Sequence, residues 1–208
     1  MTRRVKNLAQ DDFLRLELPR EFWGANCKQI PPSVQGPVNN FLRMMETLKN
    51  EGAGLLLMGG PGVGKTTVAS LVLKRGRELG WSGLFSSVSH LREDLRGRRE
   101  FDGDRTMLAR CREVDVLVLD DLSMADARDM WFGARHVEEL LAARKAARLI
   151  TVITTRMSKD AMRGEPNMNS LLATATGSLI DILITGRNYQ EIQAARLRGL
   201  VGARDVEA

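Results

Sequence analysis

The chain has few of the residues that would support disulfides, a structural metal site or a membrane anchor. It contains two cysteines, Cys27 and Cys111, which lie far apart without metal-ligand spacing, and two histidines. We expect both thiols to be reduced packing residues of a cytoplasmic protein. No stretch approaches the roughly 18 apolar residues that a membrane span requires, and segment 1–10 lacks the apolar part of a signal peptide. The sequence argues against secretion and membrane insertion.

Aromatic residues are also scarce, at 5% of the chain, while basic residues outnumber acidic ones by 31 to 26. This balance favours DNA contacts that are dominated by phosphates and tolerant of base sequence. Six basic residues gather between positions 142 and 163, where Asp160 is the single acid: Arg144, Lys145, Arg148, Arg156, Lys159 and Arg163. They flank the predicted strand 149–154, and we expect them to contact DNA phosphates together at one end of that strand. Trp131 and Phe132 are expected in the core rather than on a stacking surface.

The length of 208 residues is sufficient for one α/β core. Apolar periodicity predicts strands at 55–58, 84–88, 114–119, 149–154 and 180–185. It predicts helices at 37–49, 65–79, 89–99, 105–111, 126–146 and 158–162, with 30–37 as a linker. Such alternation indicates a parallel sheet with helices on both faces.

Residues 59–67 read GGPGVGKTT and match the phosphate-binding pattern G-x-x-x-x-G-K-[ST] directly after the apolar run 54–58. The predicted nucleotide-binding residues are Gly59, Gly60, Pro61, Gly62, Val63, Gly64, Lys65, Thr66 and Thr67. The glycines let backbone N–H groups turn toward a phosphate at a helix N-terminus. Lys65 would reach the β- and γ-phosphates of ATP, and the Thr66 hydroxyl would bind Mg²⁺. The alternative, a glycine-rich turn, does not explain the helical pattern that follows.

A second nucleotide motif is the apolar run 114–119 followed by Asp120 and Asp121. In this pattern Asp120 would hold Mg²⁺ through its water shell, and Asp121 would polarise the attacking water. Aspartate is shorter than the glutamate found in many such ATPases, so slow hydrolysis is expected. A strand ending in an Asp-rich turn is the alternative.

The order of several segments resembles the AAA+ core of the DnaC/IstB family, over roughly Leu18 to Gln190. The segments are LPREFWGANCKQIPPS, MGGPGVGKTT, FSSVSHLREDLRGR, VDVLVLDDLS, ITVITTRMS and ITGRNYQ. The resemblance implies a P-loop NTPase of the AAA+ type without a large lid domain. Members of this family load the replicative helicase onto DNA or serve as the ATP-dependent helper of a transposase.

Further roles are implied by this resemblance alone. Thr154 or Thr155 would sense the γ-phosphate, and we expect Thr155 to be catalytic with Lys65 and Asp121. Segment 22–30 would lie against the adenine. The cofactors would be ATP and Mg²⁺, and the partners would be DNA, a replicative helicase or transposase, and further copies of the chain.

Within the core, the sequence departs from the family at two places. Family members carry an arginine-containing box before the last strand, where this chain reads PNMNSLL at 166–172. The arginine that would reach a neighbouring subunit's ATP is absent there, and Arg163, Arg128 or Arg135 are the candidate substitutes. Arg156 also stands where family members frequently have asparagine.

We expect a short N-terminal segment at 1–17, an ATPase core at 18–190 and a C-terminal tail at 191–208. Phe13, Leu14, Leu16 and Leu18 would form a helix that docks a partner or would pack on the chain's own core. Three functions remain open from the sequence: a helicase loader with ATPase activity, a transposition helper, and a scaffold that binds ATP without hydrolysing it.

Overall fold

The computed structural model describes residues 8–96, 106–123, 133–189 and 191. Helices and strands alternate along these residues, and short 3-10 helices (η) precede the first long helix. Their bounds are α1 (Gln10–Arg15), η1 (Arg20–Phe22), η2 (Cys27–Gln29), α2 (Pro32–Asn50), β1 (Gly54–Met58), α3 (Lys65–Glu78), β2 (Gly83–Ser87), α4 (Val88–Arg96), α5 (Met107–Glu113), β3 (Val116–Leu122), α7 (Gly133–Ala146), β4 (Ile150–Thr155), α8 (Lys159–Gly164), α9 (Pro166–Thr176) and β5 (Leu179–Leu183).

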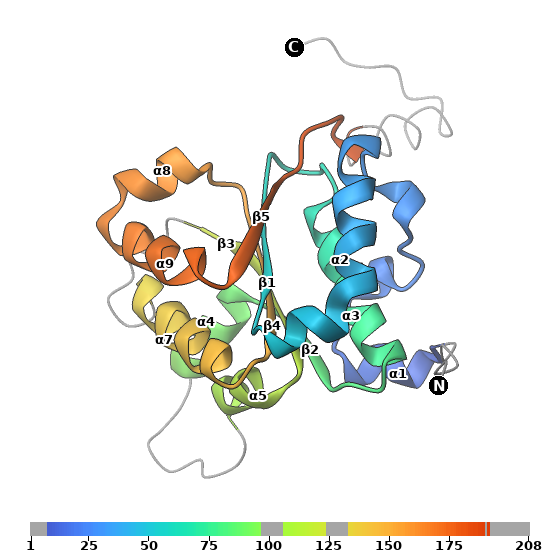
Figure 1. Cartoon of the computed structure of the whole chain (residues 1–208), viewed down its shortest axis with the longest axis horizontal. Coiled ribbons are helices and arrows are strands. Elements are labelled where there is room, and N and C mark those ends of the chain that lie inside the picture. The colour runs from blue at the N-terminus through green and yellow to red at the C-terminus, as the bar shows by residue number, and fades with distance from the viewer. Residues whose placement is uncertain (1–7, 97–105, 124–132, 190, 192–208) are drawn as a thin grey trace.

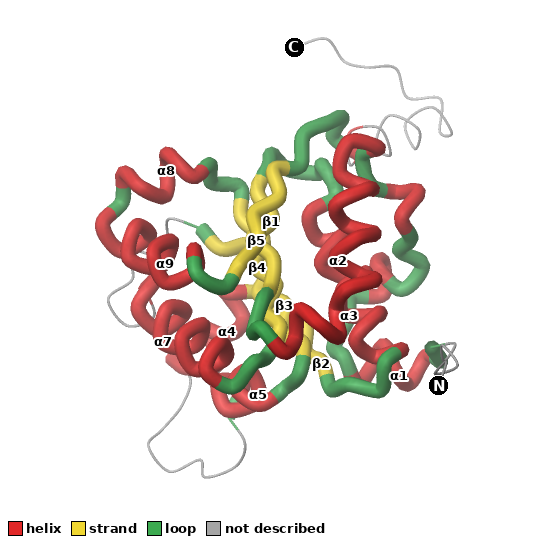
Figure 2. The backbone as a smooth tube through the Cα atoms, in the orientation of Figure 1, coloured by secondary structure: helices red, strands yellow, loops and turns green. Residues whose placement is uncertain are grey.

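Within the described residues, five strands form one parallel sheet in the order β2-β3-β4-β1-β5. Figure 1 shows α1, α2 and α3 on one side of this sheet and α4, α5, α7, α8 and α9 on the other. The same two helical layers are visible around the sheet in Figure 2. The predicted α/β fold, a parallel sheet covered on both faces, is confirmed.

Both faces of the interior strand β1 are buried. Leu55 and Leu57 pack with the apolar side chains of α2 and α3, while Leu56 and Met58 pack with those of α7 and α9. Alternate residues of a strand point to opposite faces, so a strand covered twice must be apolar throughout. This explains why the run before the glycine-rich motif shows no polar alternation.

The predicted strands agree closely with the observed ones, except that β3 spans Val116–Leu122 instead of 114–119. Residues 114 and 115 connect α5 to β3. The Asp115 carboxylate is held there by hydrogen bonds from the Ser82 N–H (2.8 Å), the Ser82 hydroxyl (2.7 Å) and Lys49. At its other end β3 continues through both aspartates and pairs with β4 again at Leu122. The two carboxylates therefore lie within the strand and do not follow it.

Segment 30–37 is not a linker. Helix α2 begins at Pro32, and Ile30, Val34 and Val38 are buried. Proline is well tolerated in the first turn of a helix, where its missing N–H would have no intrahelical partner. The prolines thus belong to the start of a helix rather than to a connection. None of the helices in the described residues is both long and apolar enough to cross a membrane.

Helix α9 was not predicted, because the sequence comparison treated residues 166–172 as an altered arginine box. Three predicted helices extend beyond what the structure describes. Residues 97–99, 105 and 126–132, including Arg128, Trp131 and Phe132, lie outside the described ranges, and their predicted roles stay predictions.

The N-terminal residues from Gln10 onward pack on the chain's own core. Leu16 and Leu18 are buried, and the Phe13 ring stacks on Trp23 with their centroids 5.3 Å apart. The Phe85 N–H donates to the Leu16 carbonyl oxygen at 2.8 Å, which attaches the segment to β2. Of the apolar residues in this segment, Leu14 is the exposed one, at 53%. Packing on the core is therefore the alternative that the structure supports for Phe13, Leu16 and Leu18.

The cysteines behave as packing residues within the described structure. Cys111 is buried, and burial raises the pKa of its thiol to about 11, so the thiol stays protonated near neutral pH. Cys27 is half-buried, and its Sγ donates a hydrogen bond to Asn39. Both cysteines are free thiols.

Arg144 is fully buried, and this corrects its expected contact with DNA. Its Nε donates to the Thr151 hydroxyl (2.8 Å), and its guanidinium nitrogens donate to the carbonyl oxygens of Cys111 (2.6 Å), Val114 (2.8 Å) and Ile150 (2.6 Å). Burial lowers the pKa of the guanidinium to about 10, which still leaves it charged at neutral pH. The side chain thus joins α7 to the starts of β3 and β4.

We predict that Arg144→Met lowers the free energy of unfolding by about 3 kcal/mol, because it leaves buried backbone carbonyls without donors. The neighbouring Lys145→Met changes an exposed side chain and should cost less than about 0.5 kcal/mol. Denaturant unfolding of the two variants measures the difference. Equal unfolding midpoints for both would show that the carbonyl contacts contribute nothing.

Candidate functional site

The glycine-rich segment 59–64 connects the carboxyl end of β1 to the first turn of α3. Gly59 has a φ of 149°, and a Cβ at this position would lie 2.2 Å from the Ile184 carbonyl oxygen. Gly62 has a φ of 67°, and a Cβ there would lie 1.7 Å from Asn188 Oδ1. Positive φ values and this close approach both require glycine. The chain that follows β5 thus closes over the loop.

The contact with residues 188 and 189 was not foreseen from the sequence. The Tyr189 N–H donates to the Gly62 carbonyl oxygen at 2.9 Å, which holds the chain after β5 against the loop. The segment ITGRNYQ was part of the family resemblance, but no role was assigned to it. Its position beside Gly62 indicates that it shapes the phosphate-binding loop.

The Lys65 side chain folds over the loop. Its Nζ donates to the carbonyl oxygens of Gly59 (2.9 Å) and Gly60 (2.6 Å). Burial lowers the pKa of Lys65, the positive charge of Arg156 lowers it further, and Asp121 and Asp120 oppose both effects. The ammonium therefore lies at the centre of the loop with another cation and two carboxylates nearby.

Asp120 joins the phosphate loop to the neighbouring strands. Its carboxylate accepts a hydrogen bond from the Thr66 hydroxyl at 3.1 Å and one from the Thr154 hydroxyl at 2.7 Å. Burial raises the pKa of Asp120, and the two hydroxyl donors oppose that shift. The Thr66 hydroxyl and the Asp120 carboxylate are hard oxygen ligands in direct contact, so they form a donor set that fits Mg²⁺.

A β-bulge directs the two adjacent aspartates to different partners. Leu119 pairs with Ile153 and Leu122 pairs with Thr155, so β3 has one residue more than β4 over this interval. Asp121 takes a φ of 60° there, and its N–H donates to the Thr154 hydroxyl at 2.9 Å. Such a bulge redirects a side chain next to a site, and here it turns Asp121 away from Asp120.

The two candidate sensor threonines have different roles in the structure. Thr154 donates to Asp120, as described above. The Thr155 hydroxyl is buried, donates to the Leu122 carbonyl oxygen (2.7 Å) and accepts from the Met157 N–H (3.1 Å). Thr155 therefore supports the end of β4, and Thr154 is the threonine whose hydroxyl contacts the carboxylate.

Arg156, which the sequence marked as a departure from the family and as a candidate DNA contact, is part of the site. Its Nε lies 3.1 Å from Asp121 Oδ1 and its Nη2 lies 3.2 Å from Asp121 Oδ2, which makes a two-point ion pair. Both side chains remain open to solvent, with 64% of Arg156 and 49% of Asp121 exposed. An exposed cation thus lies against both carboxylate oxygens of Asp121.

Helix α9 occupies the place of the family's arginine box and packs on the core. Met168, Leu171 and Leu172 are buried, and the Ser170 and Thr174 hydroxyls donate to Glu138 of α7. Its sequence contains no arginine. Among the proposed substitutes, Arg163 pairs with Asp160 within α8 at 3.1 Å, and the side chains of Arg128 and Arg135 lie outside what the structure describes.

The segment expected beside the adenine leads to the phosphate loop. The Lys74 ammonium on α3 donates to the carbonyl oxygens of Trp23 and Ala25, both at 2.8 Å. A Cβ on Gly64 would lie 3.7 Å from Ile30 Cγ2 and 3.8 Å from Pro31 Cδ. The end of segment 22–30 therefore lies close to the last glycine of the loop, and its contact with adenine stays a prediction.

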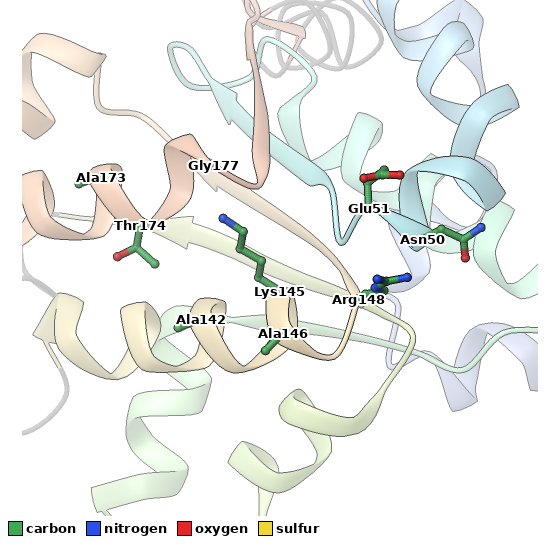
Figure 3. A pocket seen from close by; sticks show the side chains of 9 residues that line it. All are labelled: Asn50, Glu51, Ala142, Lys145, Ala146, Arg148, Ala173, Thr174 and Gly177. Carbon is green, nitrogen blue, oxygen red and sulfur yellow. The ribbon is translucent and has the colours of Figure 1, made fainter.

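The basic residues between 142 and 163 lie at opposite edges of the sheet, which corrects the expectation that they form one surface. Arg144, Lys145 and Arg148 precede β4, whereas Arg156, Lys159 and Arg163 follow it. Lys145 and Arg148 line a hollow of about 620 Å³ together with residues of α2 and α9. In Figure 3 the Lys145 side chain extends toward Thr174 and Gly177. This hollow lies at the amino ends of the strands, away from the phosphate loop.

The family model described as IstB-like ATP binding protein matches residues 40–175, which is more than half of the chain. The matched region includes the loop 59–67, both aspartates and Arg156. No curated protein sequence matches the chain.

Solved structures share its fold. The DnaC helicase loader superimposes with a TM-score of 0.68 at 23% identity, covering 80% of this chain and 100% of that one. The DnaI structure superimposes with a TM-score of 0.64 at 22% identity, covering 82% of this chain and 93% of that one. A putative primosome component from Streptococcus pyogenes serotype M3 gives 0.64 at 17% identity, covering 87% and 99%. The predicted P-loop fold of the AAA+ type is confirmed.

We predict that Lys65→Ala weakens ATP binding about 100-fold, because it removes the ammonium that would pair with the phosphates. Calorimetric titration with ATP and Mg²⁺ measures the affinity. Arg75→Ala on the same helix is the control, since that side chain pairs with Glu78 and should leave the affinity unchanged. An affinity of Lys65→Ala equal to that of the control would refute the assignment of the loop.

Proposed function

Because the chain belongs to the IstB-like ATP-binding protein family, we propose that it binds MgATP at residues 59–67 and hydrolyses it to ADP and phosphate while associated with DNA. The observation that carries this proposal is the contact of Asp120 with both Thr66 and Thr154 beside the Lys65 ammonium. These groups combine anion binding, metal binding and phosphate sensing at one edge of the sheet.

The side chains divide this chemistry among them. The backbone of Gly59–Gly64 and Lys65 would hold the phosphates, and Thr66 with Asp120 would hold Mg²⁺, which neutralises charge on the transferring phosphate. Asp121 would orient the attacking water and accept its proton. We assign the sensing of the γ-phosphate to Thr154 in place of Thr155, because the Thr155 hydroxyl bonds to backbone. The ATPase core would run from 18 to 190, between the short flanking segments 1–17 and 191–208.

Loading of a replicative helicase onto DNA is the activity that we favour. The DnaC helicase loader shares the fold over most of both chains. A transposition helper is the second candidate, since the matching family model is that of IstB-like proteins. The two differ in partner: a loader binds a helicase, whereas the helper would polymerise on duplex DNA in the presence of ATP. A scaffold without turnover is the third candidate, which the absence of arginine from α9 favours.

Lys145 and Arg148 are the cations that we propose for DNA contact. Both are exposed in the hollow of Figure 3, and neither makes an ion pair with another residue in the described ranges. In contrast, Arg156, Lys159 and Arg163 each pair with an aspartate. A phosphate of the DNA backbone could approach the first two without displacing a partner.

We predict measurable ATP turnover that DNA stimulates and that Asp121→Asn abolishes while ATP binding persists, because the variant keeps the shape of the side chain and loses the base. Phosphate release, measured with and without single- and double-stranded DNA, tests this expectation, with Lys65→Ala as the blank. Tight ATP binding without turnover under every condition would leave the scaffold as the function.

The DNA surface is tested by the double variant Lys145→Glu/Arg148→Glu. Two lost phosphate contacts should weaken DNA binding and reduce the slope of log affinity against log salt by about two. The control Arg15→Glu/Arg43→Glu makes the same change of charge on α1 and α2, across the sheet (Figure 1). A slope unchanged in the first variant would place the DNA surface elsewhere.

A further inference from the structure

We propose that Arg156 binds the γ-phosphate of ATP from within the same subunit and that it releases Asp121 when it does so. The proposal rests on the ATP site of the preceding subsection. The altered arginine box in α9 supplies no cation to the site. In this proposal the residue that directly follows β4 of the same chain supplies it.

The position of Arg156 suits this role. The residue directly follows β4, and β4 lies between β1, which leads into the phosphate loop, and β3, which carries the aspartates. Thr154, two residues earlier, already contacts Asp120. Asp121, the partner of Arg156, is adjacent to Asp120, which contacts Thr66 directly after Lys65. A phosphate bound by Lys65 would therefore lie within the field of both cations.

The two members of the ion pair are held differently by their surroundings. The bulge of β3 and the hydrogen bond from the Asp121 N–H to Thr154 hold the aspartate backbone in place. Arg156 has a long side chain that is 64% exposed, and its described ion pair is with Asp121. The guanidinium can therefore change partner while the carboxylate stays where it is.

A phosphate is the stronger partner for this guanidinium. Exposed ion pairs between side chains contribute little, because solvent screens them and ordering both side chains costs entropy. A terminal phosphate carries more charge than a carboxylate, and its oxygens match the planar fork of arginine. The exchange from Asp121 to the γ-phosphate should therefore be favourable when ATP is bound, whereas ADP offers no γ-phosphate.

This exchange determines when Asp121 can act. In the pair, the guanidinium contacts both carboxylate oxygens at 3.1 and 3.2 Å and fills space beside them that an attacking water would need. Once Asp121 is released, a water can take that place and one carboxylate oxygen can accept its proton. The water oxygen then bonds to the γ-phosphorus, the bond to the bridging oxygen breaks with its electron pair going to ADP, and the proton passes from Asp121 to the phosphate.

The first test compares ATP and ADP affinities in Arg156→Ala and Arg75→Ala. Arg75 is the control because it is an arginine paired with a carboxylate, that of Glu78, at 3.1 Å and has no part in the site. We expect Arg156→Ala to lower ATP affinity about 10- to 100-fold with ADP affinity nearly unchanged, and Arg75→Ala to change neither. An ATP-to-ADP affinity ratio equal to that of the unsubstituted protein would overturn the proposal.

The second test uses Asp121→Asn to remove the competing carboxylate. This substitution should raise ATP affinity about two- to five-fold in the otherwise unsubstituted protein, and the gain should vanish when Arg156 is already alanine. A gain that is the same in both backgrounds would contradict the exchange of partners. If the unsubstituted protein binds neither ATP nor ADP, the proposed ATP site is wrong. If it binds both, and Arg156→Ala leaves the ratio of ATP to ADP affinity unchanged, the ATP site stands and the role of Arg156 is wrong.

Discussion

The hydrogen bonds that Asp120 accepts from Thr66 and Thr154 are the contacts on which the site depends. They join the first turn of α3 to the ends of β3 and β4, because the carboxyl ends of parallel strands meet at one edge of a sheet. The same edge receives the glycine loop that leaves β1. A chain with these residues and a different strand order would leave the loop and the carboxylate apart.

Burial decides which cations are available to a ligand. Arg144 and Lys145 are neighbours in the sequence. The guanidinium of Arg144 donates its hydrogen bonds to carbonyl oxygens at the amino edge of the sheet, whereas Lys145 is exposed. A buried charge is tolerated only when several hydrogen bonds compensate its loss of water, and the Arg144 guanidinium makes such bonds. Charge counted along the sequence therefore overstates the surface that DNA could contact.

The pairing of Arg156 with Asp121 connects the third of the candidate functions to the first. A guanidinium that contacts both oxygens of Asp121 stands where the attacking water would have to lie, which fits a protein that binds ATP without turnover. If the γ-phosphate of ATP attracts the arginine more strongly, Asp121 is released, and the protein can hydrolyse the ATP that released it. The weakness of an exposed ion pair makes the second state accessible.

The sequence by itself determined the class of the fold, the strands apart from the bounds of β3, and the position of the glycine-rich loop after β1, because apolar periodicity and glycine requirements are local properties. It also located the two aspartates. Only the tertiary structure decided that Thr154 and not Thr155 contacts Asp120, that a bulge turns Asp121 toward Arg156, and that α9 packs where an arginine box was expected. These outcomes depend on strand register and on burial between elements distant in sequence, which no local pattern records.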